Sequence, residues 1–290
     1  MRMRTRARRL VLMSGATALA VVAAMGAGPG TASAGVAIPP HDFNGDGHAD
    51  LLALTSTGDL YLYPGNGSGH FLARSKIGTG WNGPTALAPA NGDWDGDGSP
   101  DMLAKLPGGT LAYYKGNGTG FSTPATAISE PGTWKSASFI PPGDFTGDGN
   151  IDIIQRDAGG HLLLFTGDGH GNLSTASTVI GAGWGSLKIY TPGDWDGDGH
   201  ADLLTRTTGG ELDLWRGNGA GGFIGGRKAI GSGWSAYKIV TPGDWNGDGH
   251  VDLLARASNG ILYLYPGNGT GGFGTRVAIG TGWGGFANLF

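Results

Sequence analysis

The chain has 290 residues, no cysteine and a formal net charge of −4, with 23 acidic and 19 basic residues. The lack of cysteine excludes a disulfide-stabilised fold, and the lack of a basic surplus argues against nucleic-acid binding. Glycine accounts for 60 residues, a share that would indicate disorder in a sequence without repeats. Here the glycines recur at matching positions, which indicates tight turns between many short strands.

Residues 1–34 have the composition of a signal peptide. Five arginines lie among the first nine residues, an apolar stretch follows, and Ala32-Ser33-Ala34 fits a small-residue cleavage site. We therefore expect a secreted protein that is cleaved after Ala34. The pair Arg8-Arg9 leaves both the Sec and the twin-arginine export routes open. No second long apolar run follows, so we expect no membrane insertion.

Five aspartate-rich nonapeptides follow one another at a spacing of 50 or 51 residues. A fixed period of this length predicts a repeat architecture with one supersecondary unit per repeat. We expect a single domain over residues 35–290, with repeats at about 42–92, 93–143, 144–193, 194–243 and 244–290. The nonapeptides are DFNGDGHAD from Asp42, DWDGDGSPD from Asp93, DFTGDGNID from Asp144, DWDGDGHAD from Asp194 and DWNGDGHVD from Asp244.

The nonapeptides have the ligand pattern of a calcium loop. Oxygen-bearing side chains stand at positions 1, 3, 5 and 9, the backbone carbonyl of position 7 is a further ligand, and glycines at positions 4 and 6 let the chain curl. We predict up to five calcium ions and a calcium-dependent fold. The hydroxyl of Thr146 is a weaker ligand than a carboxylate, so the third site should be the weakest. The predicted ligands are Asp42, Asn44, Asp46, His48 and Asp50; Asp93, Asp95, Asp97, Ser99 and Asp101; Asp144, Thr146, Asp148, Asn150 and Asp152; Asp194, Asp196, Asp198, His200 and Asp202; and Asp244, Asn246, Asp248, His250 and Asp252.

Two other classes of calcium loop begin in the same way, but the residues after position 9 exclude them. EF-hand and dockerin loops need a carboxylate at position 12 and flanking helices. The residues at position 12 here are Ala53, Ala104, Gln155, Thr205 and Ala255. The segment after each nonapeptide is short and apolar and ends at a glycine turn, which is typical of a strand.

Each repeat contains about four strand-sized segments. In the fourth repeat they lie near Ala201–Arg206, Glu211–Trp215 and Phe223–Ile230, with Lys188–Thr191 contributed by the preceding corner. Four short antiparallel strands per 50 residues predict a propeller blade. The predicted fold is therefore all-β, a β-propeller of five four-stranded blades. Val36–Pro40 and the C-terminal segment are both candidates for the strand that closes the ring.

The acidic loops, the DLLAR-like strand after them and the LYxGNGxGxF hairpin resemble the FG-GAP/VCBS repeats of integrin alpha-chain propellers and of many secreted bacterial proteins. The resemblance implies a propeller with calcium bound in a loop of each blade. Integrin-type propellers have seven blades, whereas this chain has five units. The IGxGW corner, which ends at Trp81, Trp184, Trp234 and Trp283, has a weaker resemblance to tachylectin-type propellers that bind sugars.

These features favour a monomeric binding module for carbohydrate or a cell-surface partner. The candidate ligand-binding residues are Trp81, Trp184, Trp234, Trp283, Arg206 and Arg256. The same tryptophans are candidates for packing between blades, and the same arginines for neutralising the calcium loops. A structural or adhesive wall protein is the alternative. We rank a hydrolase or lyase below both, because the sequence has no nucleophile motif and no catalytic constellation.

Overall fold

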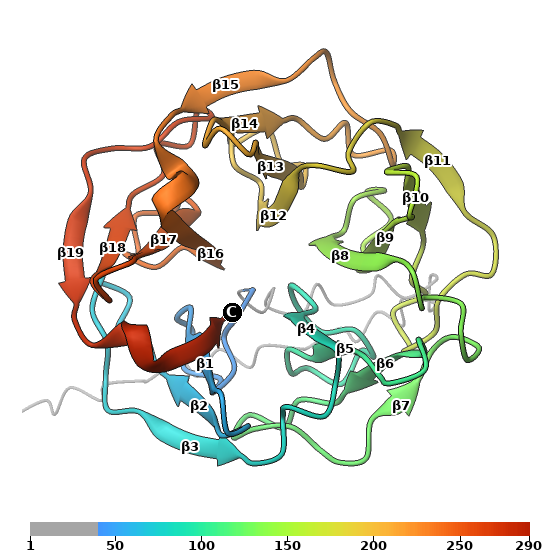
Figure 1. The fold of residues 1–290 in the computed structure, drawn as a ribbon, viewed down its shortest axis with the longest axis horizontal. Helices are drawn as coiled ribbons and strands as arrows, with labels where there is room; N and C mark the ends of the chain where they lie inside the picture. Colours follow the sequence, from blue (N-terminus) through green and yellow to red (C-terminus); the bar gives the residue numbers. More distant parts are fainter. Residues whose placement is uncertain (1–39) are drawn as a thin grey trace, which may run out of the picture. The chain divides into compact units, whose positions relative to one another are not determined.

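The structure is a computed structural model that describes residues 40–290. Within this range, five four-stranded antiparallel sheets form a ring (Figure 1). The predicted all-β propeller with five blades is confirmed. The predicted signal peptide and its cleavage site lie outside the described residues. No helix in the described part of the chain is long and apolar enough to cross a membrane.

Each of blades 2 to 5 takes its innermost strand from the segment before its acidic loop and its other three strands from the segment after it. Blade 2 consists of β4 (Ala86–Pro89), β5 (Met102–Lys105), β6 (Leu111–Tyr114) and β7 (Thr126–Ala127). Blade 3 consists of β8 (Ser138–Gly143), β9 (Asp152–Arg156), β10 (Leu162–Phe165) and β11 (Thr178–Gly181). Blade 4 consists of β12 (Lys188–Gly193), β13 (Asp202–Arg206), β14 (Leu212–Trp215) and β15 (Lys228–Gly231). Blade 5 consists of β16 (Tyr237–Gly243), β17 (Asp252–Ala257), β18 (Leu262–Tyr265) and β19 (Val277–Gly280).

Blade 1 closes the ring with a strand from the other end of the chain. Its strands are β20 (Phe286–Leu289), β1 (Leu51–Thr55), β2 (Leu60–Tyr63) and β3 (Ser75–Gly78). Beyond the end of β20, the Phe290 N–H donates to the Leu52 carbonyl at 2.9 Å, and the Leu52 N–H donates to the Phe290 carbonyl at 3.1 Å. The C-terminal candidate therefore supplies the closing strand. Most of the other candidate, Val36–Pro40, lies outside the described residues.

The outermost strand of blade 4 begins later than the sequence predicts. The predicted segment is Phe223–Ile230, whereas β15 covers Lys228–Gly231. Phe223 forms only an isolated bridge with Gly217. Gly225, with a φ of +66°, breaks the extended backbone between this bridge and β15.

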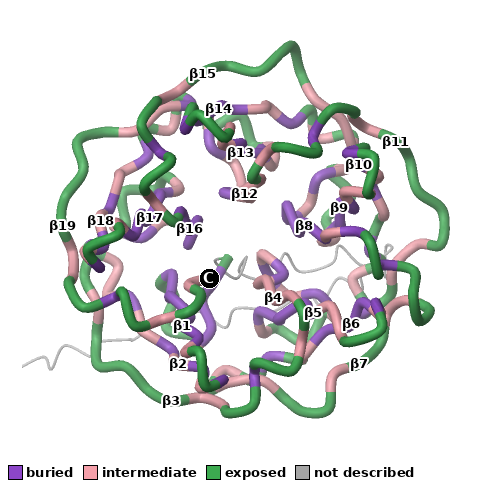
Figure 2. Tube along the Cα trace, in the orientation of Figure 1, coloured by how far each residue is buried: buried purple, intermediate pink, exposed green. Residues whose placement is uncertain are grey.

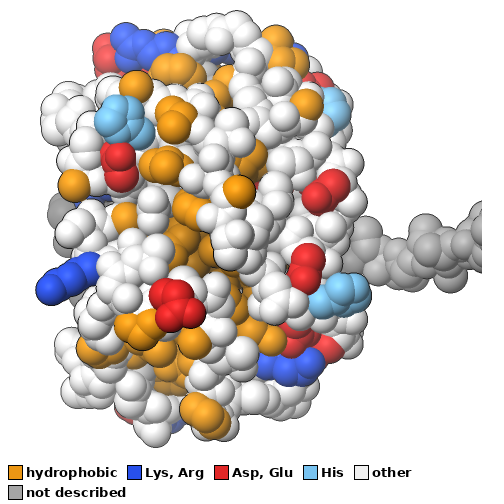
Figure 3. Space-filling model, turned by 90° about the vertical axis from the view of Figure 1, so that its right-hand side faces the viewer, with side chains coloured by type: hydrophobic (Ala, Val, Ile, Leu, Met, Phe, Trp, Pro, Cys, Tyr) orange, Lys and Arg blue, Asp and Glu red, His pale blue; other side chains and the backbone are white. Residues whose placement is uncertain are grey.

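The hydrophobic core is divided into five clusters, one between each pair of neighbouring blades. Buried residues lie on the inner strands and between blades, whereas the outermost strands are largely exposed (Figure 2). Along one side of the rim, hydrophobic side chains form a band with charged side chains on either side (Figure 3). Each cluster contains one corner tryptophan and one aromatic residue from position 2 of an acidic loop. These pairs are Trp81 with Phe43, Trp134 with Trp94, Trp184 with Phe145, Trp234 with Trp195, and Trp283 with Trp245.

Candidate functional site: acidic loops and inter-blade grooves

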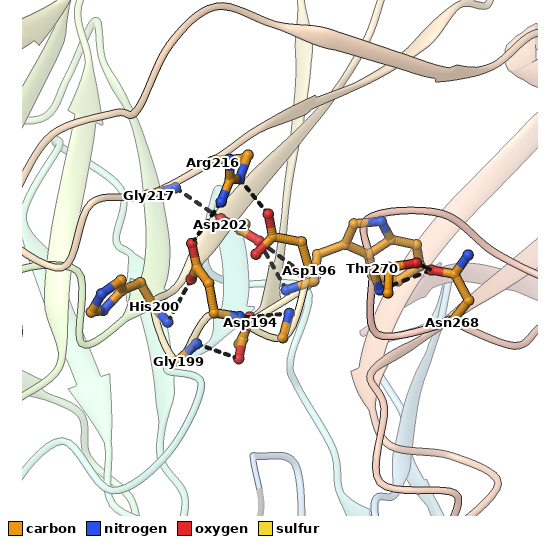
Figure 4. A network of polar contacts seen from close by, with 12 residues as sticks. Asp194, Asp196, Gly199, His200, Asp202, Arg216, Gly217, Asn268 and Thr270 are labelled. Carbon is orange, nitrogen blue, oxygen red and sulfur yellow. Dashed lines mark hydrogen bonds and ion pairs between the residues drawn. The ribbon is translucent and has the colours of Figure 1, made fainter.

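The five nonapeptides form loops with one shared backbone geometry. We number them loop 1 (Asp42–Asp50), loop 2 (Asp93–Asp101), loop 3 (Asp144–Asp152), loop 4 (Asp194–Asp202) and loop 5 (Asp244–Asp252). In loop 4, Asp194 Oδ1 accepts the N–H groups of Gly197 at 2.7 Å and Asp198 at 3.1 Å, and its Oδ2 accepts the Gly199 N–H at 2.8 Å (Figure 4). The Asp194 carboxylate therefore holds the backbone of the loop in a tight turn. The other oxygen-bearing side chains of the loop are free to converge on one point.

The aspartate at position 9 attaches each loop to the hairpin of the same blade. Asp202 Oδ2 accepts the Trp195 N–H at 3.0 Å, and its Oδ1 accepts the Gly217 N–H at 2.8 Å. The corresponding aspartates make the same two bonds in every loop. All five are fully buried. These residues are Asp50, Asp101, Asp152, Asp202 and Asp252.

Burial shifts the ionisation of these aspartates. Desolvation is the largest cause, and it raises the pKa of Asp50, Asp101 and Asp202 to about 7. It raises the pKa of Asp252 to about 6 and also raises the pKa of Asp152. Neighbouring loop carboxylates add to the increase in four of the five loops. A bound cation would have the opposite effect, because it stabilises the ionised form.

Loops 2 and 4 have the donor set of a metal site. Asp93, Asp95 and Asp101 each offer an oxygen, and these oxygens lie within 4.8 Å of one another; loop 4 offers the equivalent set. Asp95 Oδ1 and Asp196 Oδ1 are buried and have no hydrogen-bond partner. A buried, unpaired carboxylate oxygen is costly, and a hard cation at this point would satisfy it. The residues present therefore fit a metal ion.

The other loops replace the carboxylate at position 3. Asn44 Nδ2 donates to Asp46 Oδ2 at 2.9 Å, and Asn246 Nδ2 donates to Asp248 Oδ2 at 3.0 Å. Loop 3 has Thr146 at this position. The histidine ring at position 7 of loop 4, His200, lies away from the carboxylates (Figure 4), as expected if only its backbone is a ligand.

The sequence prediction missed a cation beside each of the two most acidic loops. Lys115 Nζ lies 3.0 Å from both Asp95 Oδ2 and Asp97 Oδ2. Arg216 pairs with Asp196, and its Nη2 lies 3.2 Å from Asp198 Oδ2 (Figure 4). Both cations follow the aromatic residue that ends the hairpin strand. The other hairpins have Pro64, Thr166 and Pro266 at this point, and their loops have no aspartate at position 3.

The loops also join neighbouring blades. The Gly221 N–H in blade 4 donates to the Phe145 carbonyl of loop 3 at 3.0 Å. A Cβ added at Gly197 of loop 4 would come within 2.6 Å of the Gly269 carbonyl oxygen in blade 5. A cation that orders a loop would therefore also order a contact between blades.

The tryptophans proposed as ligand contacts lie in the core. Trp81, Trp184, Trp234 and Trp283 are 3–6% exposed. Trp234 packs against Tyr265, with ring centroids 4.6 Å apart, and Trp283 has the same separation from Tyr63. Their rings therefore pack between blades and are almost entirely buried.

The recurrent arginines bind backbone carbonyls and not the acidic loops. Arg206 Nη1 donates to the Trp234 carbonyl at 2.9 Å and also to the Tyr237 carbonyl. Arg256 Nη1 donates to the Trp283 carbonyl at 2.8 Å and to the Phe286 carbonyl at 2.7 Å. Both arginines therefore hold the corner that leads into the next blade, and the neutralising role considered for them is wrong.

Two equivalent grooves lie between blades on either side of blade 5. The 4–5 groove has a volume of about 300 Å³ and lies against Ser232, Trp234, Tyr265 and Arg276. The 5–1 groove has a volume of about 350 Å³, and the equivalent residues there are Thr281, Trp283, Tyr63 and Arg74. Arg74 lies 4.7 Å from the centroid of the Tyr61 ring, and Arg276 lies 4.5 Å from that of Tyr263. Each groove thus combines an aromatic floor with a cation. Trp234 and Trp283, two of the predicted ligand-binding residues, line these grooves, whereas the sequence analysis missed Arg74 and Arg276.

A profile of FG-GAP-like repeats matches residues 42–104, 144–205 and 194–255 of the chain. A search of curated protein sequences gives no match. Among solved structures, the chain is similar to a symmetrical protein studied for its de novo evolutionary emergence, with a TM-score of 0.55 and 16% identity over 83% of this chain and 98% of that chain. It is also similar to a lectin from Agrocybe aegerita that recognises non-reducing terminal N-acetylglucosamine, with a TM-score of 0.49 and 17% identity over 83% and 79% of the two chains. At these identities the likeness concerns the fold alone.

Proposed function

The chain belongs to the FG-GAP-like repeat family, and on this premise we propose that it is a secreted, calcium-binding propeller that binds carbohydrate in grooves between its blades. Calcium is the cation that best fits loops rich in carboxylate oxygens and free of sulfur and nitrogen ligands. Each of the five loops would bind one ion. The bound calcium would supply charge neutralisation at the buried carboxylates and would fix the contacts between blades.

The observation that carries the binding proposal is the pair of equivalent grooves beside blade 5. Both grooves are lined by tyrosine, phenylalanine and a corner tryptophan. Aromatic faces bind the apolar faces of sugar rings, while the exposed hydroxyl of Ser232 or Thr281 can hydrogen-bond to the sugar hydroxyls. Volumes of about 300 and 350 Å³ lie at the lower end of the range for small-molecule pockets. Two copies on one chain would increase the avidity for a polysaccharide.

A glycan array with calcium, repeated with chelator, tests the proposal. We expect calcium-dependent binding to a defined saccharide. Ser232→Trp and Thr281→Trp each place a large ring in one groove at an exposed position, so the double variant should lose binding while it keeps its melting temperature. Thr79→Trp is the matched control, because Thr79 is exposed at the equivalent position between blades 1 and 2.

Two results would contradict the proposal. The first is an array without signal from demonstrably folded, calcium-loaded protein, which would favour the structural or adhesive alternative. The second is undiminished binding by the double variant, which would move the saccharide away from the two grooves.

A further inference from the structure

A second cavity lies at the same junction as the 4–5 groove, and it is lined by three cations. Arg206, Lys238 and Arg256 contribute to a cavity of about 450 Å³, which we call the cation pocket. Tyr237 lines both the cation pocket and the 4–5 groove. No aspartate or glutamate is among the described residues that line either one.

The positive charge of the cation pocket has no acidic partner within the described residues. The Nη1 atoms of Arg206 and Arg256 donate to neutral backbone carbonyls, and Lys238 Nζ donates to the Ala287 carbonyl at 3.3 Å. Arg256 is only 6% exposed, and burial lowers the pKa of its guanidinium. A buried guanidinium with no counter-charge is costly, so an anion entering the pocket would be stabilised.

Four other cations, on blades 1, 2 and 4, are paired with carboxylates. Lys76 pairs with Asp59 at 2.7 Å, and Arg227 pairs with the buried Asp213 at 3.0 Å. Lys115 and Arg216 pair with the acidic loops. The cation pocket therefore gathers three cations without a carboxylate in a chain whose formal net charge is −4. At the 3–4 junction Arg156 likewise donates to backbone carbonyls, but Leu187 stands there at the position of Tyr237.

The 4–5 groove extends this positive surface. Arg276 stacks on Tyr263 and donates to the hydroxyls of Tyr237 and Tyr265. A ligand that extended from the 4–5 groove across Tyr237 would contact the aromatic side chains and Arg276 at one end and the three cations of the cation pocket at the other. The 5–1 junction differs, because Leu54, Phe286 and Ala287 stand there at the positions that Arg256, Tyr237 and Lys238 have in the 4–5 junction.

We propose that the 4–5 junction binds an anionic saccharide, with a sugar ring in the aromatic groove and a carboxylate or sulfate group in the cation pocket. The inference rests on the carbohydrate-binding function proposed above and specifies the ligand class of one of its two grooves. The planar guanidinium suits both anions, because each presents oxygens that can accept paired hydrogen bonds. The 5–1 groove, which lacks two of the cations, should not prefer an acidic sugar to its neutral counterpart.

Matched pairs of saccharides test the inference in calcium-containing buffer. Trigalacturonate is compared with its methyl ester, and a sulfated oligosaccharide is compared with its desulfated form; affinities are measured by titration calorimetry. We expect the acidic member of at least one pair to bind about 10-fold more tightly, and its affinity to fall as salt rises. The two pairs distinguish carboxylate from sulfate as the recognised group.

Lys238→Gln removes one pocket charge at an exposed position and should lower the affinity for the acidic saccharide about 3- to 10-fold. It should leave the affinity for the neutral member unchanged. Lys76→Gln is the control, since it removes the same charge from a surface ion pair in blade 1. Equal affinities for acidic and neutral members, with no effect of Lys238→Gln, would overturn the inference and leave the proposed function standing. A complete lack of saccharide binding by folded protein would overturn both.

Discussion

Loop 4 and loop 5 lie on neighbouring blades and share their backbone hydrogen bonds, but they balance their charge differently. Loop 4 has four aspartates, with Arg216 from the hairpin paired to two of them. Loop 5 has three aspartates, Asn246 at position 3 and Pro266 in the hairpin. Four carboxylates with one cation and three carboxylates with none both give a formal charge of −3.

The same relation holds for the rest of the ring. Loop 2 has four aspartates and Lys115, whereas loops 1 and 3 have three aspartates and no such cation. The position 3 side chain and the hairpin residue therefore change together. This indicates that the net charge of a loop, which governs its affinity for a divalent cation, is held constant although its ligands vary.

Calcium removal should produce the largest effect. If each loop binds with a Kd of about 0.1 mM at about 1 mM calcium, each contributes about 1.4 kcal/mol, or about 7 kcal/mol in total. Since a domain is stable by about 5–15 kcal/mol, calorimetry in excess chelator should show a large fall in melting temperature. An unchanged melting temperature would show that the loops fold without metal.

Asp202→Ala in loop 4 and Asp252→Ala in loop 5 should be about equally damaging. Each change removes a buried acceptor of three backbone N–H groups, at a cost of about 3 kcal/mol or more. Chemical denaturation in calcium would measure both, with the exposed Glu130→Ala as control. If only one of the two variants lost little unfolding free energy, loops 4 and 5 would not be equivalent.

The pH dependence of stability should reverse with calcium. Burial raises the folded-state pKa of Asp50, Asp101 and Asp202 to about 7. In chelator, the stability from their protonated forms is fully present below about pH 4, the ordinary aspartate pKa, and is lost as pH rises toward 7. In calcium, stability should instead rise with pH, because binding requires ionised ligands. Parallel melting curves between pH 4 and 8 in the two buffers would refute this.

The smallest effect should come from the hairpin cations. Lys115→Thr removes a partner of Asp95 and Asp97 and should raise the calcium affinity of loop 2 about 3- to 5-fold, corresponding to about 1 kcal/mol for a partly exposed pair. Pro266→Arg, in the hairpin beside loop 5, should lower the calcium affinity of that loop. Calcium titration of both variants checks the pair. Equal affinities in all three proteins would remove the charge-matching explanation.

The sequence was sufficient to predict the blades and to place the acidic side chains of each loop together, because both are local. The nine residues of a loop include almost every group that converges in it, and the strands follow from alternation between glycine turns. The partners of the loops are less local: Arg216 lies 20 residues beyond Asp196. The sequence did contain a signal for this pairing. The hairpins of loops 1 and 5 have Pro64 and Pro266 where those of loops 2 and 4 have Lys115 and Arg216.

The grooves and the cation pocket could not be predicted in this way. Arg206 and Arg256 recur in the sequence, but only the fold shows that both line one cavity with Lys238. The corner tryptophans also recur, and repetition alone does not distinguish a ring that binds a ligand from one that packs between blades. Contacts between blades decide both questions, and they join residues that are many positions apart.

A crystal structure of residues 35–290 grown in calcium would test the central claim most directly. We expect one ion in each of the five loops, bound in loops 2 and 4 by the buried Oδ1 atoms of Asp95 and Asp196, with Lys115 and Arg216 still paired to the outer oxygens. Density for Lys115 or Arg216 inside the loops in place of calcium, or loops 1 and 5 without an ion at saturating calcium, would contradict the account.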